Sequence, residues 1–296
     1  MENKKTRIIF FGTPKEVVPV LENLTKHYEI IAVVTTPDQK SGRQQLLTPP
    51  PTKVFALEQT IPVFQPHKLS EAISELSKLD ADLFVVAAYG KIIPDEILDL
   101  PKFGAINIHP SLLPKYRGST PIQTTLLNGD ETSGITFMKM DAKMDHGPIL
   151  QQVPFTLEAT DTFDWLMQSK FTQAANLLPH IIDEYTSGKL KPQPQDESQA
   201  TYTKMITKQD GFIDLDNPPT PKKIDRMIRA YYPWPAVWTL VAIARKNDDA
   251  ISTPKVLKFL PNQMLQLEGK NPVSRKDFVN GYPELRENLN KILPQL

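Results

Sequence analysis

The chain has 296 residues, no cysteine, and 34 basic residues balanced by 34 acidic ones. The lack of cysteine excludes disulfides, thiolate catalysis and cysteine-ligated metal sites. The balanced charge does not indicate that the chain as a whole binds nucleic acid or a membrane. The length allows two domains with a sizeable core. No apolar run approaches the roughly 18 residues of a membrane span, and the opening residues lack a signal-peptide core, so the sequence predicts a cytoplasmic protein.

The first two thirds of the chain alternate short β-branched or aromatic runs with longer segments of helical periodicity. Strands are predicted at residues 7–11, 30–35, 83–88 and 105–108, and helices at 16–25, 52–58, 70–79 and 95–100. Two further strands are predicted at 134–138 and 149–153, and a long helix at 162–187. This alternation is typical of an α/β fold with a doubly wound, mostly parallel sheet covered by helices.

A change in composition marks the end of this first region. Residues 191–204 are rich in proline and polar side chains and lack periodicity, which predicts a linker between a catalytic domain at 1–190 and a smaller C-terminal domain at 205–296. The smaller domain is predicted to be β-rich behind one helix, with the helix at 221–230 and strands at 255–260 and 264–268. From residue 201 onward the chain carries 15 basic and 10 acidic residues, an excess that either favours a polyanion or reflects the ordinary scatter of surface charge.

The fourth predicted strand ends in an amide and an imidazole, Asn107 and His109. Because these residues are two apart, they face the same side of a strand, and they lie at its carboxyl end, where open α/β sheets bind ligands. One neutral and one titratable donor directed at the same point suit an oxygen that gains negative charge during a reaction. Asp145, in a polar loop between two later strands, is the candidate carboxylate that orients His109.

Other interpretations of these residues stay open at this point. Ser111, His109 and Asp145 contain the groups of a serine hydrolase triad, although no Gly-x-Ser-x-Gly turn is present. His109, Asp145 and His146 can ligate a metal, but nothing in their spacing favours such a site. Gly12 ends the first strand, yet no Gly-x-Gly-x-x-Gly follows, so no dinucleotide site is predicted.

Five motifs occur in a fixed order across residues 5–240. They are Ile9-Phe10-Phe11-Gly12-Thr13-Pro14, Ala88-Tyr89-Gly90-Lys91-Ile92-Ile93-Pro94, the run from Asn107 to Gly118, Met144-Asp145-His146-Gly147, and Arg229-Ala230-Tyr231-Tyr232-Pro233-Trp234-Pro235. In order and spacing they resemble the methionyl-tRNA formyltransferase family. The resemblance implies a transferase of translation initiation and one-carbon metabolism. It would consume 10-formyltetrahydrofolate, formylate methionyl initiator tRNA, and act as a monomer without a metal or a membrane.

The resemblance also assigns roles to individual residues. Asn107, His109 and Asp145 occupy the catalytic positions of the family. Residues 38–47 are expected to form a polar loop that enters the acceptor-stem region of the tRNA, with Arg43 as its key basic residue. The folate-binding positions correspond to Tyr89, Gly90, Ser111, Leu112, Leu113 and Pro114.

The pattern Asn-x-His followed by Asp identifies the formyl donor better than the acceptor, because other enzymes that use this donor share it. A sugar or small-amine N-formyltransferase is therefore the alternative function. A silent folate-binding or RNA-binding protein is a further alternative, and the intact set of three residues argues against it.

The resemblance further implies that the tail is a partial, shortened OB-like barrel that binds tRNA, because little chain follows Trp238. Trp234 and Trp238 are expected to pack inside it. A strip of basic side chains that contacts a nucleic-acid backbone is considered at Lys204, Lys208, Lys222, Lys223, Arg226 and Arg229.

Overall fold

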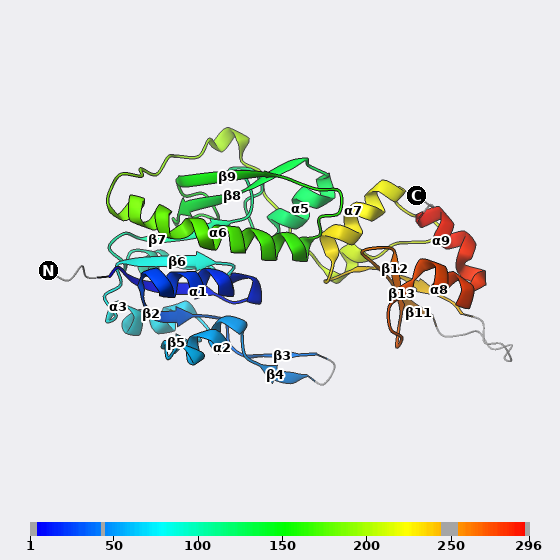
Figure 1. Cartoon of the computed structure of the whole chain (residues 1–296), viewed down its shortest axis with the longest axis horizontal. Helices are drawn as coiled ribbons and strands as arrows, with labels where there is room; N and C mark the ends of the chain where they lie inside the picture. Colours follow the sequence, from blue (N-terminus) through cyan, green and yellow to red (C-terminus); the bar gives the residue numbers. More distant parts are fainter. Residues whose placement is uncertain (1–4, 43–44, 244–253, 294–296) are drawn as a thin grey trace. The chain divides into compact units, whose positions relative to one another are not determined.

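A seven-stranded sheet organises the first part of the chain in the computed structural model, which describes residues 5–42, 45–243 and 254–293 (Figure 1). From one edge to the other its strands are β5 (Val63–Phe64), β2 (Glu29–Val34), β1 (Arg7–Gly12), β6 (Leu83–Ala87), β7 (Ala105–His109), β8 (Thr132–Lys139) and β9 (Ile149–Thr156). The first five of these strands are parallel, and β8 and β9 extend one edge in antiparallel pairing. The predicted doubly wound, mostly parallel α/β fold is confirmed.

Helices cover both faces of this sheet and create two cores. One face packs against α1 (Val18–His27), α2 (Pro51–Glu58) and α6 (Phe163–Thr186), and the other against η2 (Leu69–Ala72), α3 (Ile73–Ser77) and α4 (Asp95–Leu98). The alternation of side chains along β1 explains the division. Ile8 and Phe10 enter the first core, whereas Ile9 and Phe11 enter the second, and all four are fully buried.

The structure contains elements that the periodicity did not predict. A short helical turn, η1 (Lys15–Val17), precedes α1, and the segment expected as a polar loop at 38–47 contains a hairpin of β3 (Gln39–Ser41) and β4 (Leu46–Thr48). Pairing between these two short strands satisfies their backbone groups, which a polar composition does not reveal. A further helix, α5 (Pro121–Asn128), follows the Asn107 to Gly118 motif.

The contacts of the chain divide it into two compact units. The first comprises Met1–Pro121, Thr132–Thr156 and Met167–Thr203, and the second comprises Ile122–Glu131, Leu157–Leu166 and Lys204–Leu296. The second unit contains an antiparallel sheet in the order β10 (Val237–Val241), β11 (Lys255–Leu260), β12 (Met264–Leu267) and β13 (Val273–Ser274). It also contains α7 (Pro221–Tyr231), α8 (Arg275–Gly281) and α9 (Arg286–Ile292), so it is more helical than the single predicted helix implied.

Buried apolar side chains from these strands and helices form the core of the second unit, among them Ile224, Leu257, Phe259, Leu265, Phe278 and Leu289. Trp238 contributes to the packing as predicted, with its ring 4.9 Å from that of Phe212 and its Nε1 donating to the Lys208 carbonyl at 3.0 Å. Trp234 is 59% exposed, so its predicted packing role is wrong. In the described parts of the chain, no helix combines the length and apolarity needed to cross a bilayer.

Candidate active site

The three side chains predicted to be catalytic meet beside β7. Asn107 and His109 lie on that strand, and Asp145 reaches them from the loop that joins β8 to β9. Asn107 Nδ2 donates to Asp145 Oδ1 at 3.3 Å, and His109 Nδ1 lies 3.6 Å from Asp145 Oδ2. The side chains of His109 and Asp145 are 5% and 15% exposed, so this cluster is largely shielded from water.

The imidazole of His109 has a hydrogen-bond acceptor at one ring nitrogen and a nearby carboxylate at the other. Its Nε2 lies 2.9 Å from the carbonyl oxygen of Tyr116, and its Nδ1 faces Asp145. Because a carbonyl oxygen can only accept, Nε2 must carry a proton. A doubly protonated ring donates at both nitrogens, whereas the neutral ring donates only at Nε2. In both protonation states Nε2 is bonded to the Tyr116 carbonyl, so Nδ1 is the ring nitrogen that faces Asp145 and the reacting groups.

The backbone of Asp145 adopts a left-handed conformation with φ of 48°, which an L-residue rarely occupies without support. Its carboxylate accepts a hydrogen bond from the Gly118 N–H at 2.7 Å, and its carbonyl accepts one from Gln195 Nε2 at 2.9 Å. The neighbouring Gly147 has no room for a side chain, because a Cβ there would lie 1.9 Å from the Lys139 carbonyl oxygen. The loop that presents Asp145 is thus fixed from several directions.

The predicted folate-binding residues have different exposures. Ser111 is fully buried and donates from Oγ to the Lys115 carbonyl at 2.6 Å. Tyr89 is 2% exposed, burial raises the pKa of its hydroxyl to about 12, and within the described chain that hydroxyl has no hydrogen-bond partner. Gly90 is exposed and has φ of 84°. Leu113 is buried, whereas Leu112 and Pro114 are partly exposed. A ligand at this segment would therefore contact backbone groups and the side chains of Leu112 and Pro114.

The two other interpretations of these residues fail on geometry. Ser111 donates its hydroxyl proton to a backbone carbonyl, and neither ring nitrogen of His109 is directed at it, so a serine hydrolase triad is absent among these residues. His146 Nδ1 lies 2.6 Å from Asp141 Oδ2 and its Nε2 lies 3.5 Å from Glu197 Oε1. It therefore faces away from a shared site with His109. Among the described residues, no group of three or more His, Cys, Asp or Glu side chains is arranged to hold a metal.

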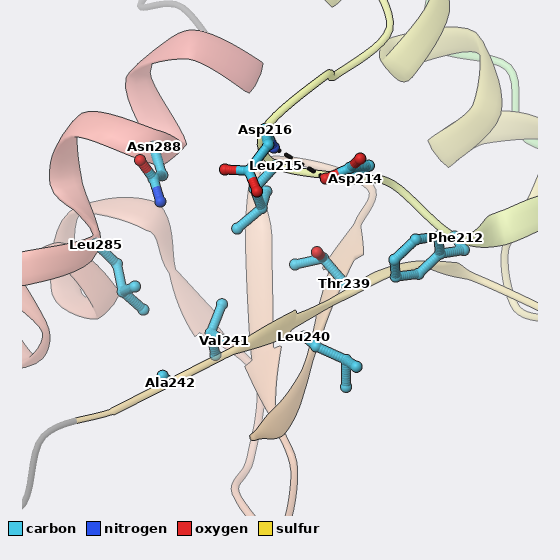
Figure 2. Close-up of a pocket in the computed structure, with 10 residues that line it drawn as sticks. All are labelled: Phe212, Asp214, Leu215, Asp216, Thr239, Leu240, Val241, Ala242, Leu285 and Asn288. Carbon is cyan, nitrogen blue, oxygen red and sulfur yellow. Dashed lines mark hydrogen bonds between the residues drawn. The ribbon is translucent and has the colours of Figure 1, made fainter. Parts of the chain in front are cut away.

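Two cavities in the described parts of the chain are large enough to consider as ligand sites. A cavity of about 410 Å³ in the second unit takes its polar lining from Asp214, Asp216, Thr239 and Asn288 (Figure 2). None of its described lining residues is a histidine, lysine or arginine, so it offers no strong donor to a developing oxyanion. A cavity of about 620 Å³ in the first unit is lined by Lys102, Lys139 and Asp141 together with apolar and acidic neighbours. The second cavity adjoins the loop that carries Asp145.

The structure describes only some of the residues predicted to contact tRNA. Arg43 lies outside the described residues. The basic strip considered along α7 is partly engaged within its own unit, since Arg226 Nη1 donates to the Asn128 carbonyl at 2.9 Å. Arg229 donates to the Asp225 carboxylate at 3.0 Å and to the Asp161 carbonyl at 3.2 Å. These two arginines therefore already bind protein groups, and Lys208 Nζ also lies over the ring of Trp238, 5.4 Å from its centroid.

Comparison with known sequences places this geometry in a family. The profile described as "Formyl transferase" matches residues 5–182, and the profile described as "Formyl transferase, C-terminal domain" matches residues 205–263. The chain belongs to the formyl transferase family. Sequence similarity to named members of this family supports the assignment, and the matched region includes Asn107, His109 and Asp145.

Two relatives of this formyl transferase share more than two fifths of the aligned residues. A protein of Chloroflexus aurantiacus named methionyl-tRNA formyltransferase is 44% identical over 236 residues, covering 79% of this chain and 76% of the relative. A protein of the same name in Listeria monocytogenes is 42% identical over 236 residues, covering 79% of this chain and 75% of the relative. A sugar N-formyltransferase structure from a Shewanella species has a TM-score of 0.63 at 17% identity, covering 87% of this chain and 98% of that one. That likeness shows a common fold.

Some residues of the site were missed by sequence reasoning. Arg117 is fully buried and lies within the Asn107 to Gly118 motif, but a buried arginine cannot be told from an exposed one by its neighbours in sequence. Gln195 lies in the segment predicted to be a linker, 50 residues from its partner Asp145. Only the tertiary structure reveals that this segment contacts the site.

Proposed function

We propose that this formyl transferase transfers the formyl group of 10-formyltetrahydrofolate to the α-amino group of methionyl initiator tRNA. The observation that carries the proposal is the convergence of Asn107, His109 and Asp145 on one point beside β7. The similarity to relatives named methionyl-tRNA formyltransferase supports the choice of acceptor. This acceptor would place the enzyme in the cytoplasm, where initiator tRNA is used.

The chemistry of the reactants matches what these side chains offer. In the donor, the formyl nitrogen bears an aromatic ring that withdraws its lone pair, so the formyl carbon is open to attack. In the acceptor, the ester lowers the pKa of the amine below the free α-amino value of about 8, so the neutral nucleophile is available near pH 7. The enzyme must then stabilise a tetrahedral oxyanion and remove one proton from the amine.

Each step of the transfer has a candidate group. The amine nitrogen bonds to the formyl carbon, and the carbonyl electron pair moves onto oxygen. Asn107 Nδ2 and the Nδ1–H of protonated His109, which is 3.6 Å from Asp145 and not hydrogen-bonded to it, donate hydrogen bonds to that oxygen. Asp145, held against His109, accepts the surplus proton of the amine, directly or through water. The carbon–nitrogen bond to the folate then breaks as an oxygen electron pair re-forms the carbonyl, and the folate nitrogen takes the proton held by Asp145 and leaves as tetrahydrofolate.

The folate donor is expected to bind beside this cluster. The cavity of about 620 Å³ in the first unit adjoins the loop that carries Asp145, and it presents Lys102 and Lys139. These two ammonium groups can pair with the carboxylates of a folate glutamate, in competition with Asp95, Asp99 and Asp141, which also line the cavity. The segment with Gly90, Leu112 and Pro114 offers backbone groups and partly exposed apolar surface for the rings of the folate.

A competition assay tests the choice of acceptor. The purified protein receives donor with a labelled formyl group, together with charged initiator tRNA, an amino sugar nucleotide and glycinamide ribonucleotide in equal amounts. We expect the label to reach methionyl-tRNA at least a hundred-fold faster than either small amine, and uncharged tRNA to remain unlabelled. Preferential labelling of the amino sugar would support the sugar N-formyltransferase alternative and overturn the proposal.

A further inference from the structure

The segment of residues 193–203, termed here the connector, bonds directly to the loop that carries Asp145. Gln195 Nε2 donates to the carbonyl oxygens of Asp145 at 2.9 Å and of Gly147 at 2.7 Å. Gln195 Oε1 accepts from Arg117 Nε at 3.1 Å and from Nη2 at 2.8 Å. The amide therefore uses both of its N–H donors on the loop and both oxygen lone pairs on the guanidinium.

The orientation of the Gln195 amide is imposed by Arg117. A flipped amide would direct its NH₂ at guanidinium donors and its oxygen at two carbonyl oxygens, so all four contacts would become repulsive. Arg117 is itself held in place by the Glu197 carboxylate at 2.6 and 3.0 Å and by the Tyr202 hydroxyl at 3.2 Å. All five N–H groups of the guanidinium are thereby bonded, which allows the side chain to be fully buried.

Backbone hydrogen bonds hold the connector against the two sides of the site. Gln193 exchanges two hydrogen bonds with Ile149, at 2.7 and 2.8 Å, where β9 begins after the Asp145 loop. The Arg117 N–H donates to the Thr201 carbonyl at 2.8 Å, and the Thr203 N–H donates to the Arg117 carbonyl at 2.8 Å. Backbone hydrogen bonds thus hold the connector at Gln193 and again at Thr201 and Thr203, and Gln195 lies between these points.

We propose that Gln195 is a positioning residue for Asp145, oriented by Arg117. Asp145 sits in a left-handed backbone conformation and reaches His109 only if its loop keeps this path. The hydrogen bond to its own carbonyl fixes the peptide from which the carboxylate projects. The proposal rests on the proposed function, because it assigns to Gln195 the placement of the carboxylate that takes the proton.

The variant Gln195→Glu separates the two halves of this contact. A carboxylate keeps, and strengthens, the bond to Arg117, but it cannot donate to the carbonyl oxygens of Asp145 and Gly147. The matched control is Gln193→Glu, which adds the same charge two residues away, where the side chain donates to the Lys191 carbonyl at 3.2 Å. We expect Gln195→Glu to lower kcat about ten- to a hundred-fold with KM for the folate donor little changed, and the control to stay within two-fold of the original.

Two further measurements distinguish positioning from a general loss of structure. Hydrogen exchange should accelerate at residues 140–148 in Gln195→Glu and not in Gln193→Glu, with the rest of the chain unchanged. In an Asp145→Asn background, adding Gln195→Glu should lower kcat by less than two-fold, because the carboxylate that it positions is already gone. If Gln195→Glu does not fold, Gln195→Met, which removes the donors without adding charge, is measured in its place.

These measurements distinguish a failure of the positioning role from a failure of the proposed function. The positioning role is wrong if hydrogen exchange at residues 140–148 is unchanged in Gln195→Glu. It is also wrong if exchange accelerates there while kcat stays unchanged. A full additional loss of kcat in the Asp145→Asn background also overturns it, since Gln195 would then act by another route. If the original protein fails to formylate methionyl-tRNA while exchange still accelerates only in Gln195→Glu, the proposed acceptor fails and the tether of the loop stands.

Discussion

The loop that carries Asp145 and the hairpin of β3 and β4 both connect elements of the first unit, but they are built in opposite ways. The Asp145 loop is fixed by residues distant in sequence, with Gly118 bonded to its carboxylate and Gln195 to its backbone. The described residues of the hairpin pair mainly with one another and extend away from the sheet (Figure 1). Its Leu46 and Leu47 are 62% and 67% exposed.

We expect this difference to correspond to two tasks within one enzyme. Proton transfer and oxyanion stabilisation require side chains held within a fraction of an ångström, so the loop near the chemistry must be constrained by its surroundings. A surface that receives a large partner needs exposed side chains instead, and exposed apolar residues such as Leu46 and Leu47 suit contact with one. Substitutions in the two regions should therefore separate kcat from KM.

The largest effect is expected from Asp145→Asn. The change keeps the volume of the side chain, but it removes the charge that faces His109 and places an amide opposite the donating N–H of Gly118 or the amide of Asn107. We expect kcat to fall about 10³-fold, within the range for loss of a general base. Steady-state transfer to methionyl-tRNA measures it, and circular dichroism melting confirms the fold. A loss below ten-fold would exclude Asp145 as the acceptor of the proton.

A smaller effect is expected from Asn107→Ala. Its Nδ2 donates to Asp145, and no second acceptor for this amide lies within hydrogen-bond distance among the described residues, so one N–H remains for the oxyanion. Loss of one such donor typically costs about 3 kcal/mol of barrier, or about a hundred-fold in kcat. The free energy of unfolding should change little, because the backbone pairing of β7 is kept. Near-normal turnover in the folded variant would remove Asn107 from the mechanism.

The sequence could predict the arrangement of those site residues that lie close together along the chain. Asn107 and His109 share a face because a strand repeats every two residues, and the strands themselves follow from buried β-branched runs. Asp145 was a candidate from its motif, but its approach to His109 depends on how the loop folds back along the sheet.

Nonlocal hydrogen bonding accounts for what the sequence did not reveal. The composition of the segment around Gln195 indicates an extended chain, and the structure adds one helical turn there, η3 (Glu197–Gln199). Such a composition fits a free linker and a strip bonded to two loops equally well. Its partners are Ile149 and Arg117, which lie tens of residues away and leave no periodic signal. Likewise, the hydrogen bond from Arg226 to the Asn128 carbonyl depends on the fold of the second unit and could not be predicted from the sequence.

Gly147→Ala tests the constraint on the Asp145 loop without touching a reacting group. Since the added methyl would meet the Lys139 carbonyl at 1.9 Å, the loop must shift. We expect the free energy of unfolding to fall by about 2 kcal/mol, as for other overpacked sites, and kcat to fall about ten-fold as Asp145 is displaced. The matched control is Gly281→Ala at the end of α8, where a Cβ meets nothing within 4 Å, and which should leave kcat unchanged and raise the free energy of unfolding by at most about 1 kcal/mol. A Gly147→Ala protein as stable and active as the original would show that the loop is not constrained.

The smallest effect is expected at the hairpin, from the double change Leu46→Ser and Leu47→Ser. Because both side chains are largely exposed, the free energy of unfolding should stay within about 0.5 kcal/mol of the original. If these side chains contact the acceptor, KM for methionyl-tRNA should rise several-fold while kcat and KM for the folate donor stay the same. The control is Leu57→Ser, at a side chain that is 58% exposed on α2 and away from the hairpin. A fall in kcat with KM unchanged would show that the hairpin shapes the chemistry, and the division between a constrained loop and a receptive surface would then be wrong.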